Sequence, residues 1–220
     1  MTEPARALTE VREKIAHAAK LARREPSDIE LVAISKTNPA EAILPLIAAG
    51  QRVFGESRVQ EAQTKWPPLL EAHGELSLHL VGQLQSNKAE EAARLFDCIH
   101  SLDRSSLVAA LARAFDKAGR QVSCFVQVDI GEETQKGGCP IAEVPALLAE
   151  ARGADIPVIG LMCVPPHGVE PAPYFALLAK IAADNSLAKL SMGMSGDYET
   201  AVMLGATHVR VGSALFGARG

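Results

Sequence analysis

The sequence predicts an eight-stranded (β/α)8 barrel, and three observations lead to this fold class. Short β-branched runs alternate with longer Ala- and Leu-rich segments from near the start of the chain to its end. They form eight strand-plus-helix units, which is the number that closes a parallel sheet into a barrel. The 220 residues lie at the short end for this fold, so we expect a single domain over 1–220.

A doubly wound open sheet is the alternative arrangement of the same elements. That fold usually carries a glycine-rich phosphate-binding turn directly after its first strand. Here the corresponding turn reads Lys36-Thr37-Asn38-Pro39 and contains no glycine. The closed barrel is therefore favoured.

The elements begin with a helix from about Pro4 to Arg24, in which Val11, Ile15 and Ala18 fall on one apolar face. This helix precedes the first strand and is extra to the eight units. The strands are expected at Glu30–Ser35, Arg52–Phe54, Leu78–Gly82, Cys98–Ser101, Ser123–Asp129, Val158–Leu161, Lys189–Met192 and His208–Val211. The helices between them are expected near Pro39–Ala49, Ser57–Leu70, Asn87–Leu95, Arg104–Ala118, Ile141–Ala151, Pro173–Ala183 and Asp197–Leu204, with a short one after Ser213.

Composition excludes several functional classes. A net charge of −4 with scattered Lys and Arg residues offers no basic stripe that could replace the counterions of a nucleic acid. No apolar run has the form of a secretory signal or the length of a membrane span, so we expect a cytoplasmic protein. Without a second domain to complete a site, a monomer is the default expectation. The four cysteines lie far apart, without a C-x-x-C pair or a histidine at metal spacing, which predicts reduced thiols and no metal site.

The first candidate functional group is Lys36, which follows the apolar strand over Leu31–Ser35. Taken alone, a lysine at a strand end is usually a side chain that reaches solvent. In a barrel, however, the carboxyl-terminal strand ends line the active site, and partial desolvation there favours the neutral amine that attacks a carbonyl. We therefore expect Lys36 to form a Schiff base.

The second candidate feature is a pair of glycine-rich segments, 191–196 and 210–214, each of which ends a strand and opens a helix. Free backbone N–H groups at such turns can bind an anion, although the glycines also permit tight turns without any ligand. The loops after strands seven and eight are the usual phosphate-binding place in this fold. Together the two segments predict a phosphate site that includes Met194, Ser195, Gly212 and Ser213.

Barrel closure joins the two features, because the last strand lies beside the first. Lys36 and the turn Gly212–Ser213 should then be neighbours at one rim. An amine and a phosphate site at that separation suit pyridoxal phosphate, whereas a Schiff-base aldolase acting on a sugar phosphate would look similar.

Arg210 is a third candidate. Strand alternation puts His208, Arg210 and Gly212 on one side, and Val209, Val211 and Ser213 on the other. Arg210 has three possible roles: to contact a phosphate, to face a pyridine nitrogen, or to pair with a carboxylate at the rim. A cation beside the ring nitrogen would disfavour its protonation and weaken the cofactor as an electron sink.

Two further segments, 54–61 and 79–88, begin at expected strand ends and carry polar residues toward the same rim, among them Ser57 and His79. On its own, His79 is more simply a packed strand histidine, since nothing in the sequence supplies its partner.

These motifs resemble the YggS/PROSC family of pyridoxal-phosphate homeostasis proteins over almost the whole chain. The matching stretches are Val32–Lys36, Phe54–Glu61, His79–Lys88, Gly160–Met162, Leu190–Ser195 and Val209–Ala218. The resemblance implies the barrel of the alanine-racemase N-terminal domain, with Lys36 as the Schiff-base lysine and with the phosphate at Ser195, Gly212 and Ser213. The family commonly has Asn-Tyr where this chain has Ser57-Arg58, which puts a polar contact from Ser57 to the ring in doubt.

The function that the resemblance implies is intracellular homeostasis of pyridoxal phosphate, with apo-enzymes that receive the cofactor as the expected partners. The alternative is a pyridoxal-phosphate-dependent amino-acid racemase, which would need a second catalytic group on the opposite face of the ring. We expect a cofactor carrier without catalytic residues. The cofactor-binding residues that we expect are Lys36, Ser57, His79, Met194, Ser195, Arg210, Gly212 and Ser213.

Overall fold

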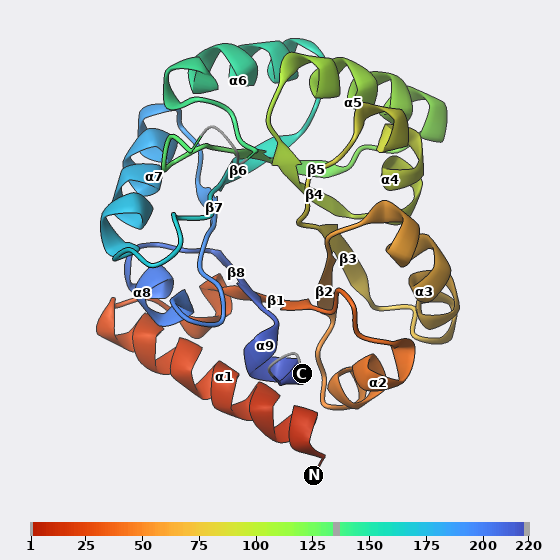
Figure 1. Cartoon of the computed structure of the whole chain (residues 1–220), viewed down its shortest axis with the longest axis vertical. Coiled ribbons are helices and arrows are strands. Elements are labelled where there is room, and N and C mark those ends of the chain that lie inside the picture. Colours follow the sequence, from red (N-terminus) through yellow and green to blue (C-terminus); the bar gives the residue numbers. More distant parts are fainter. Residues whose placement is uncertain (1, 134–136, 218–220) are drawn as a thin grey trace.

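The computed structural model describes residues 2–133 and 137–217 and confirms the closed barrel. Eight parallel strands form one continuous ring, in which β8 pairs with β1 (Figure 1). The strands are β1 Glu30–Ile34, β2 Val53–Glu56, β3 Ser77–Leu80, β4 Cys98–Leu102, β5 Ser123–Gln127, β6 Val158–Met162, β7 Lys189–Ser191 and β8 His208–Val211. The α-helices that the structure describes are α1 Glu3–Leu21, α2 Ala40–Ala48, α3 Val59–Ala72, α4 Ala89–Leu95, α5 Ser105–Ala118, α6 Val144–Gly153, α7 Ala172–Asp184, α8 Tyr198–Met203 and α9 Ser213–Phe216.

The expected boundaries are correct to within a few residues, and the differences have local causes. The helix expected from Ser57 begins at Val59, because Arg58 is still extended at φ −136° and ψ 129°. The helix expected from Ile141 begins at Val144, after a short 3-10 turn over Ile141–Glu143. Pro145 lies in the first turn of that helix, where its missing N–H removes no hydrogen bond.

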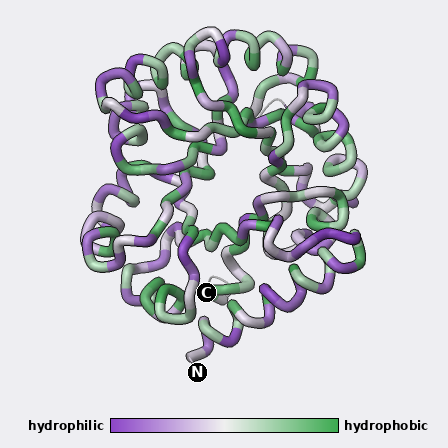
Figure 2. Tube along the Cα trace, turned by 180° about the vertical axis from the view of Figure 1, so that it is seen from behind, coloured by the Kyte–Doolittle hydropathy of each residue, from purple (hydrophilic) through white to green (hydrophobic). Residues whose placement is uncertain are grey.

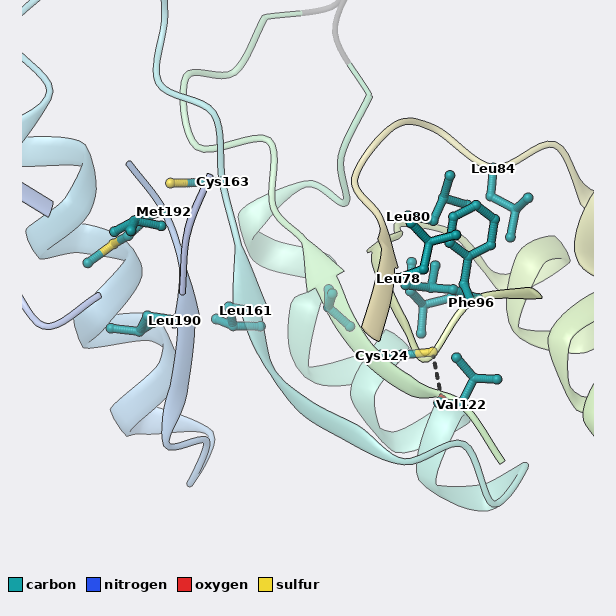
Figure 3. Close-up of a cluster of buried hydrophobic side chains, with 14 of the residues drawn as sticks. Leu78, Leu80, Leu84, Phe96, Val122, Cys124, Leu161, Cys163, Leu190 and Met192 are labelled. Atoms are coloured by element: carbon teal, nitrogen blue, oxygen red, sulfur yellow. Dashed lines mark hydrogen bonds between the residues drawn. The ribbon is translucent and has the colours of Figure 1, made fainter. Parts of the chain in front are cut away.

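The two faces of the strands have different surroundings. The outward face packs against the helices in one large apolar core; Figure 3 shows part of it, with Leu78 and Leu80 beside Phe96. Figure 2 shows the corresponding alternation of apolar and polar positions along the surrounding helices. The inward face contains a smaller apolar cluster of Cys98, Phe125 and Met162, surrounded by polar side chains.

All four cysteines are buried and free, as expected for reduced thiols. Burial raises the pKa of Cys124 to about 12, and its thiol donates to the Val122 carbonyl at 3.4 Å (Figure 3). None of the helices in the described part of the chain combines the length and the apolarity that crossing a bilayer would require.

The extra helix α1 lies along α8 and α9 (Figure 1). Its buried side chains are Leu8, Val11, Ile15, Ala18 and Ala19. Since α8 and α9 follow the loops after β7 and β8, this packing supports the segments that carry the expected phosphate site.

We predict that Ile15→Ala lowers the free energy of unfolding by about 2–5 kcal/mol, because a side chain that is only 4% exposed leaves a cavity between α1 and the barrel. The matched control is Leu21→Ala near the end of the same helix, where the side chain is 62% exposed and the change should stay within about 0.5 kcal/mol. Urea denaturation of both variants measures the difference, and equal effects would contradict the packing of α1.

Candidate functional site

Six of the eight expected site residues lie in loops or turns at the carboxyl-terminal rim of the barrel, and His79 and Arg210 lie in its interior. Lys36 lies in the loop after β1, Ser195 in the loop after β7, and Gly212 with Ser213 directly after β8. Strands β7, β8 and β1 are consecutive neighbours in the ring. A Cβ atom on Gly212 would lie 3.3 Å from the Ile34 carbonyl oxygen, so glycine permits the close approach of the two strand ends. The expected adjacency of Lys36 and the Gly212–Ser213 turn is confirmed.

Ser195 organises the turn after β8. Its Oγ accepts hydrogen bonds from the backbone N–H groups of Gly212, at 3.1 Å, and Ala214, at 3.3 Å. With both lone pairs in use, its hydroxyl hydrogen is free to donate outward, and the described residues offer it no acceptor. The backbone N–H groups of Ser195, Gly196 and Ser213 likewise have no partner among the described residues. These donors from two adjacent loops suit an anion.

Three further expected residues, Lys36, Met194 and Ser57, lie at the rim but outside the turn that Ser195 organises. Lys36 is exposed, in a loop two positions beyond the end of β1. Met194 is 40% exposed in the loop after β7. Ser57 is half-buried, and its carbonyl oxygen would lie 2.1 Å from a Cβ atom on Gly82, so the loops after β2 and β3 are in close contact.

Arg210 points into the barrel, on the same side of β8 as His208, as the strand alternation predicted. Its Nη1 donates to Ser191 Oγ at 2.6 Å, and its Nη2 donates to the Cys163 carbonyl at 2.8 Å. Among the described residues, no carboxylate pairs with the guanidinium, so the third role considered for it, pairing with a rim carboxylate, is not observed. Burial lowers the pKa of Arg210 from its usual value, although an arginine remains protonated.

A chain of hydrogen bonds continues from Arg210 through the barrel interior. Ser191 Oγ lies 2.8 Å from His100 Nδ1, and His100 Nε2 lies 3.0 Å from His79 Nδ1. Arginine can only donate, so Ser191 must accept from it and pass its own hydroxyl hydrogen to His100 Nδ1. His100 then carries its proton on Nε2 and donates to His79 Nδ1. Arg210 thereby fixes the direction of donation along this series of hydrogen bonds and the neutral tautomer of each imidazole.

Burial keeps both imidazoles neutral. Desolvation lowers the pKa of His79 from 6.5 to about 4 and lowers the pKa of the fully buried His100 still more clearly. A proton added to His79 Nδ1 would face the Nε2–H of His100 and break the chain. The ring of His208 lies close to both, with centroids 6.2 Å from His79 and 6.0 Å from His100. Its Nε2 lies 3.1 Å from the Glu30 carboxylate, and this bond is the main cause of the lowered pKa of Glu30.

His79 is a packed histidine of β3, as expected, and the partner that the sequence did not supply is His100 on the adjacent strand. His79 is buried in the barrel interior and reaches Arg210 only through Ser191 and His100. His100 and Ser191 were not identified from the sequence. The sequence could have indicated them, because both are polar residues at inward positions of expected strands. Buried polar residues on the inner face of a barrel need hydrogen-bond partners, which they find in one another.

The interior also brings together His79, Cys98 and His100, whose ligand atoms all lie within 4.8 Å of one another. Two features indicate that these three side chains form a hydrogen-bonded cluster rather than a metal site. The lone pair of His79 Nδ1 already accepts from His100, and burial raises the pKa of Cys98 well above 9, which keeps it a thiol rather than the thiolate that binds metals.

The low pKa of His79 predicts a pH dependence of stability. Above pH 6.5 the imidazole of His79 is neutral in both the folded and the unfolded protein. Between pH 6.5 and about pH 4 it is protonated in the unfolded protein and still neutral in the folded protein, so falling pH favours unfolding. Compared with His79→Gln, the wild type should therefore lose about 1.4 kcal/mol of unfolding free energy per pH unit between these limits. Urea denaturation from pH 8 to pH 4 measures it. His17→Gln, on the exposed face of α1, is the control, and curves for wild type and His79→Gln that run parallel would refute the burial argument.

Comparison with protein families places residues 8–220 in the family described as "Alanine racemase, N-terminal domain". The chain is 37% identical over 225 residues to the "Pyridoxal phosphate homeostasis protein" of Pseudomonas aeruginosa, covering 100% of this chain and 97% of that protein. It is also 37% identical over 231 residues to the Escherichia coli K12 protein of the same name, covering 100% of this chain and 98% of that protein.

Solved structures agree. The structure of PipY from Synechococcus elongatus with pyridoxal phosphate bound is 40% identical, with a TM-score of 0.82, and covers 92% of this chain and 100% of that one. The structure of PipY without the cofactor has a TM-score of 0.83. The alanine racemase of Bartonella henselae shares the fold, with a TM-score of 0.68 at 17% identity, while 97% of this chain matches 59% of that enzyme.

Proposed function

Because the chain belongs to the pyridoxal phosphate homeostasis proteins, a family built on the alanine racemase N-terminal domain, we propose that it binds pyridoxal phosphate and acts in its homeostasis. The observation that carries the proposal is that the Lys36 loop lies beside the turn after β8. This turn and the loop after β7 hold hydrogen-bond donors, at Ser195, Gly196 and Ser213, that have no partner among the described residues. One end of this arrangement suits an aldehyde and the other suits a phosphate.

The residues present fit the cofactor. Bound there, pyridoxal phosphate would supply an aldehyde that condenses with the Lys36 amine, forming a carbon–nitrogen double bond and releasing water. The serine hydroxyls and backbone N–H groups at Ser195 and Gly212–Ser213 would hold the phosphate. Met194 and Ser57, at the same rim, would border the ring.

Arg210 supports a carrier role. Its two observed hydrogen bonds leave three N–H donors for other partners, and both groups that accept from it are neutral. We propose that this cation faces the ring nitrogen, where it disfavours protonation. A ring without that proton is a weak electron sink, which suits storage and delivery to apo-enzymes better than catalysis.

The competing proposal is an amino-acid racemase, which the fold shared with alanine racemase keeps open. Deuterium exchange at the α-carbon of the common amino acids separates the two. A carrier shows no saturable exchange that depends on Lys36, whereas such exchange would establish the enzyme.

We predict that Lys36→Ala removes the visible absorbance of the imine and leaves the melting temperature of the ligand-free protein unchanged, because the exposed side chain has no role in the core. The checks are an absorption spectrum with pyridoxal phosphate, borohydride reduction and mapping of the modified peptide. In the wild type, the peptide that contains Lys36 should carry the modification. If that peptide is unmodified, Lys36 is not the residue that forms the Schiff base.

We also predict that Ser195→Ala weakens pyridoxal phosphate binding by about 1.5–3 kcal/mol, because it removes a hydroxyl donor to a charged acceptor. Pyridoxal, which lacks the phosphate, should bind the variant and the wild type almost equally. Ser106→Ala, on the exposed start of α5, is the control. Equal losses for both ligands, or none, would place the phosphate elsewhere.

A further inference from the structure

The loop that carries Lys36 adopts an unfavourable backbone conformation. Thr37 has φ +63°, in the left-handed region that β-branched residues rarely occupy. Such a conformation persists only where the surrounding structure holds it. Lys36 itself is exposed and forms no hydrogen bond through its amine to the described residues, so its neighbours must provide the restraint.

Two side chains of α3, Lys65 and Glu61, form hydrogen bonds with the backbone of the residues next to Lys36. Lys65 Nζ donates to the carbonyl oxygens of Ser35, at 2.9 Å, and Asn38, at 3.0 Å, which flank Lys36 and Thr37. The carboxylate of Glu61 accepts the Thr37 N–H at 2.6 Å and pairs with Lys65 at 2.9 Å. The backbone is therefore fixed before, at and after the strained residue, and only the side chain of Lys36 remains free.

A buried carboxylate completes the arrangement. The side chain of Glu56 is fully buried at the end of β2, and its Oε1 lies 2.7 Å from Lys65 Nζ, whose side chain is 9% exposed. The same oxygen accepts hydrogen bonds from Ser35 Oγ, at 2.7 Å, and Trp66 Nε1, at 2.9 Å. The other oxygen, Oε2, has no partner among the described residues.

Stability does not explain this cluster. Buried ion pairs rarely stabilise a fold more than apolar residues of the same size would, and a buried carboxylate oxygen without a partner adds a further penalty. The cluster does, however, fix the geometry of one four-residue loop, the one that bears the reactive amine.

We infer that Lys65, Glu56 and Glu61 form a clamp that positions Lys36, and that they are positioning residues of the cofactor site. The inference deepens the proposed function and rests on it. A clamped loop presents the amine in one place before the ligand arrives, so less conformational entropy is lost when the carbon–nitrogen bond forms. The clamp should therefore matter for a ligand that carries the aldehyde and not for one held by ring and phosphate alone.

The test compares two ligands on matched variants. Lys65→Met removes the ammonium while keeping most of the chain length; Glu61→Gln keeps an acceptor for the Thr37 N–H and should have a smaller effect. Lys180→Met, which breaks an exposed pair with Asp184 on α7, is the control. We expect Lys65→Met to weaken pyridoxal phosphate at least about tenfold, and 4-deoxypyridoxine 5'-phosphate, which has no aldehyde, less than about twofold. Equal losses for both ligands, or no loss for either, would overturn the positioning role.

A second readout needs no ligand. In the ligand-free protein the Thr37 amide is hydrogen-bonded to Glu61, so its hydrogen exchange should be slow, and Lys65→Met should accelerate it at least about tenfold while core amides of β1 stay protected. Unchanged exchange would overturn the clamp even if affinity falls. Should wild type itself form no imine, the proposed function fails, while the exchange experiment still decides whether the clamp exists.

Discussion

The pairing of β8 with β1 is the constraint on which the site depends. Its register sets Val32 against Arg210 and Ala33 against Val211, and from there the two strand ends continue into the Lys36 loop and the Gly212–Ser213 turn. These segments are far apart in the sequence, and only closure of the ring makes them neighbours. The small residue at position 212 allows this approach to be close.

Closure also creates an interior that has to satisfy its own polar groups. Three histidines and an arginine lie on the inner face, where solvent cannot satisfy them. Because Arg210 has no acceptor, the hydrogen bonds through Ser191 and His100 run in one direction and end on a neutral His79. Among the described residues, Arg210 therefore donates its hydrogen bonds in the interior to neutral groups.

The two halves of the rim are built by different means. On the β7–β8 side, backbone N–H groups and a serine hydroxyl form an open set of donors, which depends on small residues and tight turns. On the β1–β2 side, a buried ion cluster holds a strained loop behind an exposed lysine. The first arrangement suits a ligand group that is held by many hydrogen bonds, and the second suits a single side chain that must form a covalent bond.

The sequence by itself determined the elements, the barrel and the shared side of His208 and Arg210 on the last strand, because strand and helix periodicities are local and the number of units limits how a parallel sheet can close. It also selected Lys36 and the donor-rich turns as candidates for a site, since both follow strand ends. Only the tertiary structure decided that His79 pairs with His100, that Lys36 is exposed, and that Lys65 lies behind its loop. Those contacts join different strands and helices, and they depend on strand register and helix placement, which no local pattern of residues encodes.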